Sequence, residues 1–337
     1  LADAIPEYLR KDGYWHDIST DIKSWEDRYD MTQHCLDGLP DLNTANKEIQ
    51  GYVLDFLKEC VDIGVDGFRF DMAKSIETPY DHAAFASDFW PTVVGGIQEY
   101  AGNDLYIYGE VLDSPGQLPL AAYTKHMSVT DNSWGRGLLT EGNRGSAASI
   151  ANGYNKGADA SQLVVWAECH DDFATTASHN TSKISTTSIN KAWALIAARA
   201  DVMGLYFARP ANFDSQKLGE GTVTGWANKE VKAVNEFHNA FVGTTEYIAN
   251  ENGIAYCERG TAGVVLVNPN GSGNVNVKAN KMANGTYIDT ITGNTFTVSN
   301  GRIQGQIGST GIAVVWSGKT GCDHNWNAAT CDAAKTC

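Results

Sequence analysis

Three short apolar runs of this chain each end in carboxylic acids, a residue type that can transfer protons or attack an electrophilic carbon. The first run, Gly67-Phe-Arg-Phe-Asp71, places an arginine two residues before an aspartate. A guanidinium beside a carboxylate keeps it ionised and fixes its orientation, as a nucleophile requires. The same spacing also occurs in ordinary structural salt bridges, so this run alone does not decide between the two interpretations.

Two further runs favour the catalytic interpretation. They are Leu105-Tyr-Ile-Tyr-Gly-Glu110 and Leu163-Val-Val-Trp-Ala-Glu-Cys-His-Asp171, and each has strand composition followed by a loop and a helical stretch. A (β/α) barrel builds its active site from residues at the ends of several parallel strands. Three acids buried beside apolar runs for structural reasons alone would be costly. We therefore interpret the chain as an enzyme.

The acids lie in motifs that resemble those of the α-amylase family of glycoside hydrolases. Gly67–Lys74, Gly109-Glu110 and His170-Asp171 resemble three of its four best-known motifs. Leu39-Pro-Asp-Leu-Asn43 is similar to an additional motif in the loop after barrel strand three. The motifs follow the family's order, and the resemblance extends over residues 1–317.

The resemblance implies retaining endo-hydrolysis of α-1,4-glucosidic bonds in starch-like glucans. Asp71 would be the nucleophile, and Glu110 the general acid and then the base that activates water. The apolar run before Glu110 suits a raised pKa. Asp171 would bind hydroxyls of the distorted sugar.

Three further residues would contact the substrate or orient the nucleophile. The resemblance implies that Arg69 orients Asp71, that Lys74 reaches the sugar on the leaving side, and that His170 donates to a sugar hydroxyl. The family often has histidine after this lysine, where the chain has Ser75. Cys169 is unusual in the last motif and is interpreted as a small, buried apolar side chain.

The resemblance also implies a structural calcium ion. Its ligands here would be Asp41, from the Leu-Pro-Asp-Leu segment, and the backbone carbonyl of Ser75. Calcium prefers several hard oxygen ligands. The asparagine expected from the family's first motif is absent from residues 1–65, so we expect an incomplete site.

We expect an α/β fold, a partial (β/α)8 TIM barrel with about five of its eight strands, followed by a C-terminal antiparallel β-sandwich. Residues 1–43 would form a lobe inserted after barrel strand three, and residues 44–243 the C-terminal part of the catalytic barrel. Residues 244–317 would form the sandwich. Residues 318–337 would be a Cys-containing tail at the start of an appended segment.

The expected barrel strands lie near 66–71, 105–110, 126–131, 162–169 and 202–207. Apolar spacing predicts a helix over 44–62 with Thr44 as its cap. Residues 72–100 would hold a helix with a core stripe from Phe85 to Ile97. Two more helices are expected over 188–200 and 231–241.

The start of the chain suggests that upstream strands are missing. No run before residue 66 resembles a buried parallel strand, so Leu1 would fall in the loop after strand three. We therefore expect a processing, cloning or assembly boundary at Leu1. Because open sheet edges are prone to aggregation, we expect this chain alone to be inactive or poorly folded.

Two clusters of residues leave alternatives open. The aromatic residues of the lobe, including Trp15 and Trp25, would either stack on sugars or simply pack the lobe. In the tail, metal binding competes with disulfides or an unpaired tail for the residues Cys322, His324, Cys331 and Cys337.

The amino-acid composition limits the classes of molecule that this chain is expected to bind. A net charge of −15 argues against nucleic acid and anionic membranes, and suits a neutral polysaccharide or oligosaccharide. No apolar run is long enough to span a membrane. We expect a monomer. Secretion to the extracellular space is inferred from the family and the tail.

Other activities share these motifs. An α-glucan transglycosylase or an α-1,6-cleaving enzyme would carry the same acids. A non-catalytic carbohydrate-binding derivative is a third alternative, against which the intact Asp71, Glu110 and Asp171 speak.

Overall fold

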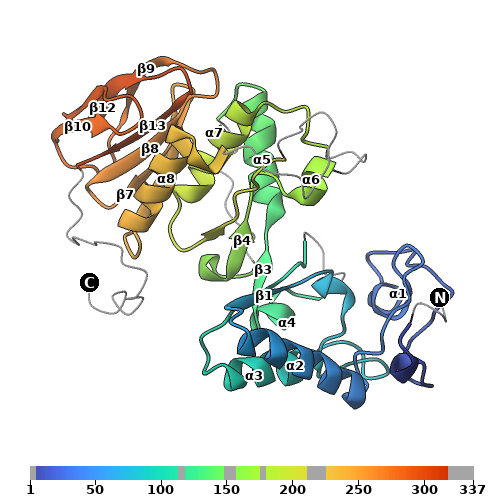
Figure 1. The fold of residues 1–337 in the computed structure, drawn as a ribbon. Coiled ribbons are helices and arrows are strands. Elements are labelled where there is room, and N and C mark those ends of the chain that lie inside the picture. Colours follow the sequence, from blue (N-terminus) through green and yellow to red (C-terminus); the bar gives the residue numbers. More distant parts are fainter. Residues whose placement is uncertain (1–4, 113–117, 148–156, 175–179, 211–224, 318–337) are drawn as a thin grey trace. The chain divides into compact units, whose positions relative to one another are not determined.

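The computed structural model describes residues 5–112, 118–147, 157–174, 180–210 and 225–317 (Figure 1). The chain forms two compact units. The first comprises Leu1–Asp131 and Asn155–Val164, and the second Asn132–Tyr154 and Val165–Cys337. The predicted tail lies outside the described residues.

Parallel strands form the centre of the first unit. They are β1 (Gly67–Phe70), β2 (Tyr106–Gly109), β3 (Ser128–Thr130) and the beginning of β4 (Leu163–Val165). β5 (Met203–Gly204) completes the sheet order, which follows the order of the chain. Parallel strands in chain order, separated by helices, are barrel topology, so the predicted partial (β/α) barrel is confirmed.

Helices α2 (Lys47–Asp62) and α3 (Phe89–Tyr100) lie side by side in the first unit (Figure 1). Leu54 of α2 approaches Gly96 of α3 so closely that a Cβ there would lie 3.0 Å from a leucine methyl. α3 buries Phe89, Trp90, Val93, Val94 and Ile97. Phe85, predicted to begin this stripe, precedes the helix and stacks on His82.

The predicted cap of α2 is wrong. The N-cap is Asn46, whose side chain accepts hydrogen bonds from the backbone N–H groups of Glu48 and Ile49. The Thr44 hydroxyl instead donates to the buried carboxylate of Glu77. Both residue types can cap a helix, and a tertiary partner decided which one does.

The segment before α2 carries two short helices, η1 (Glu7–Leu9) and α1 (Arg28–Gln33). Arg28 of α1 forms hydrogen bonds of 2.8 and 2.9 Å to both oxygens of the buried Asp81. Its guanidinium also donates to the carbonyl of Lys74, at 2.7 Å. α1 is thereby tied to η2 (Ala73–Ser75), which follows β1. The short helices η4 (Ala160–Gln162) and α4 (Ala121–Thr124) complete the unit.

The second unit has a helical part and a β part. Its helices are α5 (Asn132–Asn143), α6 (His170–Ala174), α7 (Thr186–Ala197), η6 (Gly225–Ala227) and α8 (Lys229–Ala240). α5 and α8 both pack on α7, which is buried from Ile189 to Ala197. A Cβ at Gly135 of α5 would collide with the carbonyl of Trp166, so glycine permits this close approach.

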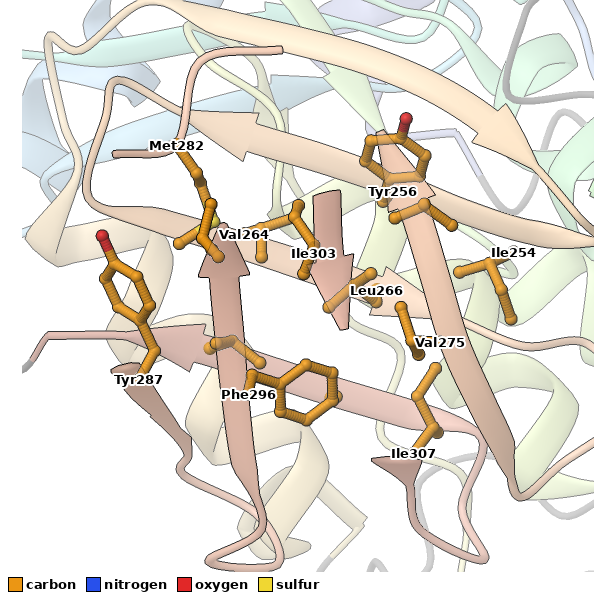
Figure 2. Packing of buried hydrophobic residues seen from close by; sticks show 14 residues of the cluster. Ile254, Tyr256, Val264, Leu266, Val275, Met282, Tyr287, Phe296, Ile303 and Ile307 are labelled. Carbon is orange, nitrogen blue, oxygen red and sulfur yellow. The ribbon is translucent and has the colours of Figure 1, made fainter. Parts of the chain in front are cut away.

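Eight antiparallel strands form the β part, in the order β6-β7-β8-β13-β10-β11-β12-β9. Their bounds are Glu246–Glu251, Ile254–Arg259, Gly263–Val267, Gly273–Lys278, Gly285–Asp289, Thr295–Ser299, Arg302–Ile307 and Ile312–Trp316 for β6 to β13. Figure 2 shows their apolar side chains, among them Leu266, Phe296 and Ile303, converging on one core. This confirms the predicted C-terminal antiparallel β-structure.

α8 covers one face of this sheet. Phe237 of α8 and Phe241, the C-cap of α8, lie against Trp316 of β13, with ring centroids 6.2 and 5.7 Å from that of Trp316. Gly263 of β8 leaves room for both rings, because a Cβ there would lie 2.5 Å from Phe241. Among the described residues, no helix is both long enough and apolar enough to cross a membrane.

Candidate active site

Asp71 and Glu110 each follow directly after a strand of the parallel sheet. β1 and β2 pair in register, with Arg69 opposite Tyr108 and Phe70 opposite Gly109. The ladder continues one residue further, because the N–H of Glu110 donates to the carbonyl of Phe70 at 2.9 Å. The pairing therefore places both acids at the C-terminal ends of neighbouring strands.

Arg69 joins the two acids. One guanidinium nitrogen lies 2.6 Å from Oδ1 of Asp71, and another lies 3.0 Å from Oε1 of Glu110. The two carboxylates differ sharply in exposure: the Asp71 side chain is 72 % exposed and that of Glu110 only 6 %. A positive charge held between two acids reduces their mutual repulsion and fixes their orientation.

The environment of Glu110 favours its protonated form. Burial raises the pKa of Glu110, and the neighbouring Asp71 raises this pKa further through a hydrogen bond and its charge. The N–H of Met72 and the guanidinium of Arg69 oppose that shift without cancelling it. The raised pKa expected from the sequence is thus present, and its largest cause is burial.

The backbone between β1 and η2 is strained at the site. Met72 has φ 43°, in the left-handed region that non-glycine residues rarely adopt. This conformation accompanies a hydrogen bond of 3.2 Å from the Met72 N–H to Oε2 of Glu110. Strained residues of this kind cluster at functional sites.

Lys74 contacts Glu110 through its backbone, while its side chain contacts Trp25. Its N–H donates to the carbonyl of Glu110 at 3.3 Å. Its ammonium group lies over the ring of Trp25, 4.4 Å from the centroid. Lys74, Glu110 and Trp25 were each named separately in the sequence, and the structure brings Lys74 into contact with the other two.

The predicted calcium ligands are in a mixed environment. Asp41 is largely buried and lies 2.6 Å from Nδ1 of His16, whose Nε2 lies 3.3 Å from the buried Glu77. Asp41 therefore already has an imidazole as a close polar neighbour. The Ser75 hydroxyl is buried without a hydrogen-bond partner among the described residues. Calcium binding by Asp41 and the backbone carbonyl of Ser75 stays a prediction.

His16 and Glu77 were missed by sequence reasoning. Glu77 also accepts hydrogen bonds from Gln33 and Thr44, so its buried carboxylate collects donors from three separate segments. No motif includes His16. Its only sequence signal is its place in an aromatic, acid-rich segment, which did not indicate a partner.

His170 and Asp171 lie in the second unit, on the first turn of α6. Nε2 of His170 is 3.5 Å from Oδ1 of Asp171, and both side chains are about half exposed. The predicted strand 162–169 ends early, at Val165. Beyond the strand, Glu168 pairs with Arg209 at 2.6 Å and accepts a hydrogen bond from Thr181, while Asp172 accepts one from Trp166.

Cys169 differs from its prediction. The residue is only partly buried, and burial together with the charge of Asp172 raises the pKa of its thiol to about 12. The thiol is therefore protonated at neutral pH. Its position between the sheet and α6 leaves the sulfur close to the side chains of His170 and Asp171.

Comparison with known proteins gives a consistent result. The family model "Alpha amylase, catalytic domain" matches residues 15–130. An α-amylase of Clostridium acetobutylicum is 35% identical over 303 residues, which cover 87% of this chain and 38% of that protein. An α-amylase of Butyrivibrio fibrisolvens is 29% identical over 343 residues, covering 90% of this chain and 35% of that protein. The chain thus spans little more than a third of the length of these relatives.

Solved structures of low sequence identity share the fold. α-Amylase I from Eisenia fetida superposes with a TM-score of 0.68 at 17% identity, covering 91% of this chain and 73% of that one. The α-amylase from Geobacillus thermoleovorans, solved with acarbose, gives 0.68 at 15% identity, covering 92% and 73%.

Proposed function

This chain belongs to the α-amylase family of glycoside hydrolases, and we propose that it supplies the nucleophile and the acid/base of a retaining α-glucan hydrolase. The observation that carries the proposal is the single guanidinium of Arg69, which contacts both Asp71 and Glu110. Retaining glycosidases hold their two carboxyl groups about 5–5.5 Å apart, whereas inverting ones leave room for a water. Two acids that share one arginine suit the retaining arrangement.

In this mechanism the two acids act in turn. The exposed Asp71 attacks the anomeric carbon, and the glycosidic bond breaks as Glu110 gives its proton to the leaving oxygen. Glu110, now ionised, takes a proton from water, and the resulting hydroxide equivalent releases the sugar from Asp71. Burial of Glu110 supports the first step, because a raised pKa keeps the proton on this carboxyl group to higher pH than on an exposed glutamate.

Other residues would hold the sugar. We assign hydroxyl binding to His170 and Asp171, and the leaving side to Lys74. The support for Lys74 is its position beside Glu110 and over Trp25, an exposed aromatic ring of the kind that stacks on sugars. The support for His170 and Asp171 is the motif in which they occur.

α-1,4-Linked glucan is the proposed substrate. A relative of the same fold, α-amylase I from Eisenia fetida, was solved as a variant in complex with maltohexaose. A cyclomaltodextrin glucanotransferase also shares the fold, at a TM-score of 0.67 and 17% identity, so transfer remains the second candidate. Maltooligosaccharides from starch, with pullulan and cyclodextrin left intact, would favour α-1,4 hydrolysis over α-1,6 cleavage and transfer.

The stereochemistry of the first product tests the mechanism directly. In the protein that carries this chain, proton NMR of fresh starch digests should show the α-anomer of the new reducing ends before mutarotation. Asp71→Asn should abolish turnover while maltohexaose binding persists. Initial release of the β-anomer would contradict the retaining assignment, and full turnover of Asp71→Asn would remove Asp71 from its role.

Secretion and the monomeric state stay predictions. Fractionation of the producing culture and light scattering of the purified protein test them.

A further inference from the structure

Three different donor groups come together where α6 begins. The side chains of Cys169, His170 and Asp171 each offer one ligand atom, and these atoms all lie within 4.8 Å of one another. Among the residues that the structure describes, no other three His, Cys, Asp or Glu side chains meet in this way. The nitrogen–oxygen edge of the group is 3.5 Å.

The distance between the nitrogen and the oxygen suits a small tetrahedral ion. Zinc binds sulfur at about 2.3 Å and nitrogen or oxygen at about 2.0–2.2 Å, so neighbouring ligand atoms lie roughly 3.3–3.8 Å apart. The His170–Asp171 edge already has this length. A set of one sulfur, one imidazole nitrogen and one carboxylate oxygen favours zinc or cadmium over calcium, which prefers oxygens alone.

Hydrogen bonds to the side chain of Asp172 hold the backbone of this group in place. Oδ2 of Asp172 accepts from the N–H of Cys169 at 3.2 Å and from the indole of Trp166 at 3.1 Å. Its Oδ1 accepts two bonds from Arg136, at 2.8 and 3.1 Å. Asp172 is almost fully buried, so these contacts fix the turn that presents the three donors.

Two of the three donors are open to solvent. The side chains of His170 and Asp171 are 49 % and 58 % exposed, and Cys169 is a free cysteine. A bound ion would therefore keep an open coordination position for water.

We propose that Cys169, His170 and Asp171 form an open binding site for zinc-type divalent cations, and that a bound cation blocks sugar binding there. Binding replaces the thiol proton, which passes to solvent, by a sulfur–metal bond. The blocking part rests on the proposed function, because it requires His170 and Asp171 to contact the sugar. The ion would act as an inhibitor.

Cadmium absorption tests the site. Cadmium–thiolate bonds absorb in the near ultraviolet, so the protein that carries this chain is titrated with Cd²⁺ alone. Cys169→Ser and Cys169→Ala should each lose one equivalent of this absorption relative to the parent, with unchanged circular dichroism. Cys60→Ser, which changes a partly buried cysteine of α2, should lose none. Equal absorption in the parent and both Cys169 variants would overturn the site.

A second measurement tests the inhibition of sugar binding separately from the binding of the metal. Zn²⁺ should weaken maltohexaose binding by the parent and by Cys60→Ser, and at least tenfold more zinc should be needed in Cys169→Ser. If cadmium binds through Cys169 but zinc leaves maltohexaose binding unchanged, the blocking part is wrong and the metal site stands. The absorption experiment needs no turnover, so a failure of the proposed hydrolysis leaves it decisive.

Discussion

Two buried glutamates, one in each unit, show how the same residue is used for opposite purposes. Glu258 of β7 accepts hydrogen bonds from the backbone N–H groups of Asn280, Lys281 and Met282, at 2.6 to 3.1 Å. Glu110 accepts one backbone hydrogen bond, shares Arg69 with Asp71, and has its pKa raised by burial. A buried carboxylate surrounded by donors stabilises a fold, whereas one placed beside another acid keeps a transferable proton.

The arginines of the two regions differ in the same way. Arg259 of β7 is buried and donates to the carbonyls of Ala198, Arg199, Phe241 and Thr244, near the ends of α7 and α8. Arg69 is 30 % exposed on its side chain and donates to two carboxylates. Arg259 donates hydrogen bonds to backbone carbonyls near helix ends, whereas Arg69 places a positive charge between two carboxylates.

The sharpest test of the comparison exchanges each glutamate for glutamine. Glu110→Gln should lower turnover of starch by about a thousandfold or more, because general acid catalysis is lost, and should leave the free energy of unfolding nearly unchanged. Steady-state kinetics and urea unfolding of the protein that carries this chain measure both. Comparable turnover by the variant would place the acid elsewhere.

Arg69→Met should have the next largest effect, a fall in turnover of about a hundredfold. Arg69 holds the pKa of Glu110 down, so its removal raises that pKa further. Because Glu110 acts in its protonated form, activity is lost as pH rises through this pKa, and the alkaline limb of the pH–rate profile should shift to higher pH. Arg302→Met, which breaks an arginine–glutamate pair in the β part, is the control and should leave the profile in place. A shift to lower pH would contradict the assignment.

Glu258→Gln should destabilise the second unit by about 2 kcal/mol. The amide nitrogen of glutamine would face backbone N–H donors that the carboxylate now accepts. Denaturant unfolding measures the loss, with Glu236→Gln, an exposed position on α8, as the matched control. Equal stability of the two variants would remove the structural role of Glu258.

Replacing His16 tests a third arrangement, in which one imidazole contacts two carboxylates, those of Asp41 and Glu77. His16→Phe should cost about 1–2 kcal/mol, because Asp41 and Glu77 each lose a partner. If His16 occupies the place of a calcium ion, added Ca²⁺ should leave the melting temperature of the parent unchanged. A calcium-dependent rise that Asp41→Asn abolishes would instead support the calcium prediction.

The smallest effect is expected at Lys74. Lys74→Ala removes its contact with Trp25 and the proposed leaving-side contact, and should raise KM about threefold with little change in kcat. Lys125→Ala is the control, since Lys125 makes the same kind of contact with Tyr80. A large fall in kcat for Lys74→Ala alone would place Lys74 in the chemical step.

Much of the barrel could be predicted because strand positions follow from local apolar runs. All five expected strands appear, although 162–169 is shortened to Leu163–Val165 and 202–207 to Met203–Gly204. The helix over 44–62 was predicted, but its cap was not, because Thr44 has a partner far away in the chain. Phe85 fits the helical spacing yet lies outside α3, since spacing does not show where a helix begins.

The sequence by itself determined that Arg69 and Asp71 would lie together and that Glu110 would end an apolar strand, since both depend on residues adjacent in the chain. Only the tertiary structure decided that one arginine reaches both acids, that His16 links Asp41 to Glu77, and that Lys74 lies over Trp25. Those contacts join segments that are distant in sequence. Their energy depends on distances and burial that arise only when the strands pair and the lobe packs.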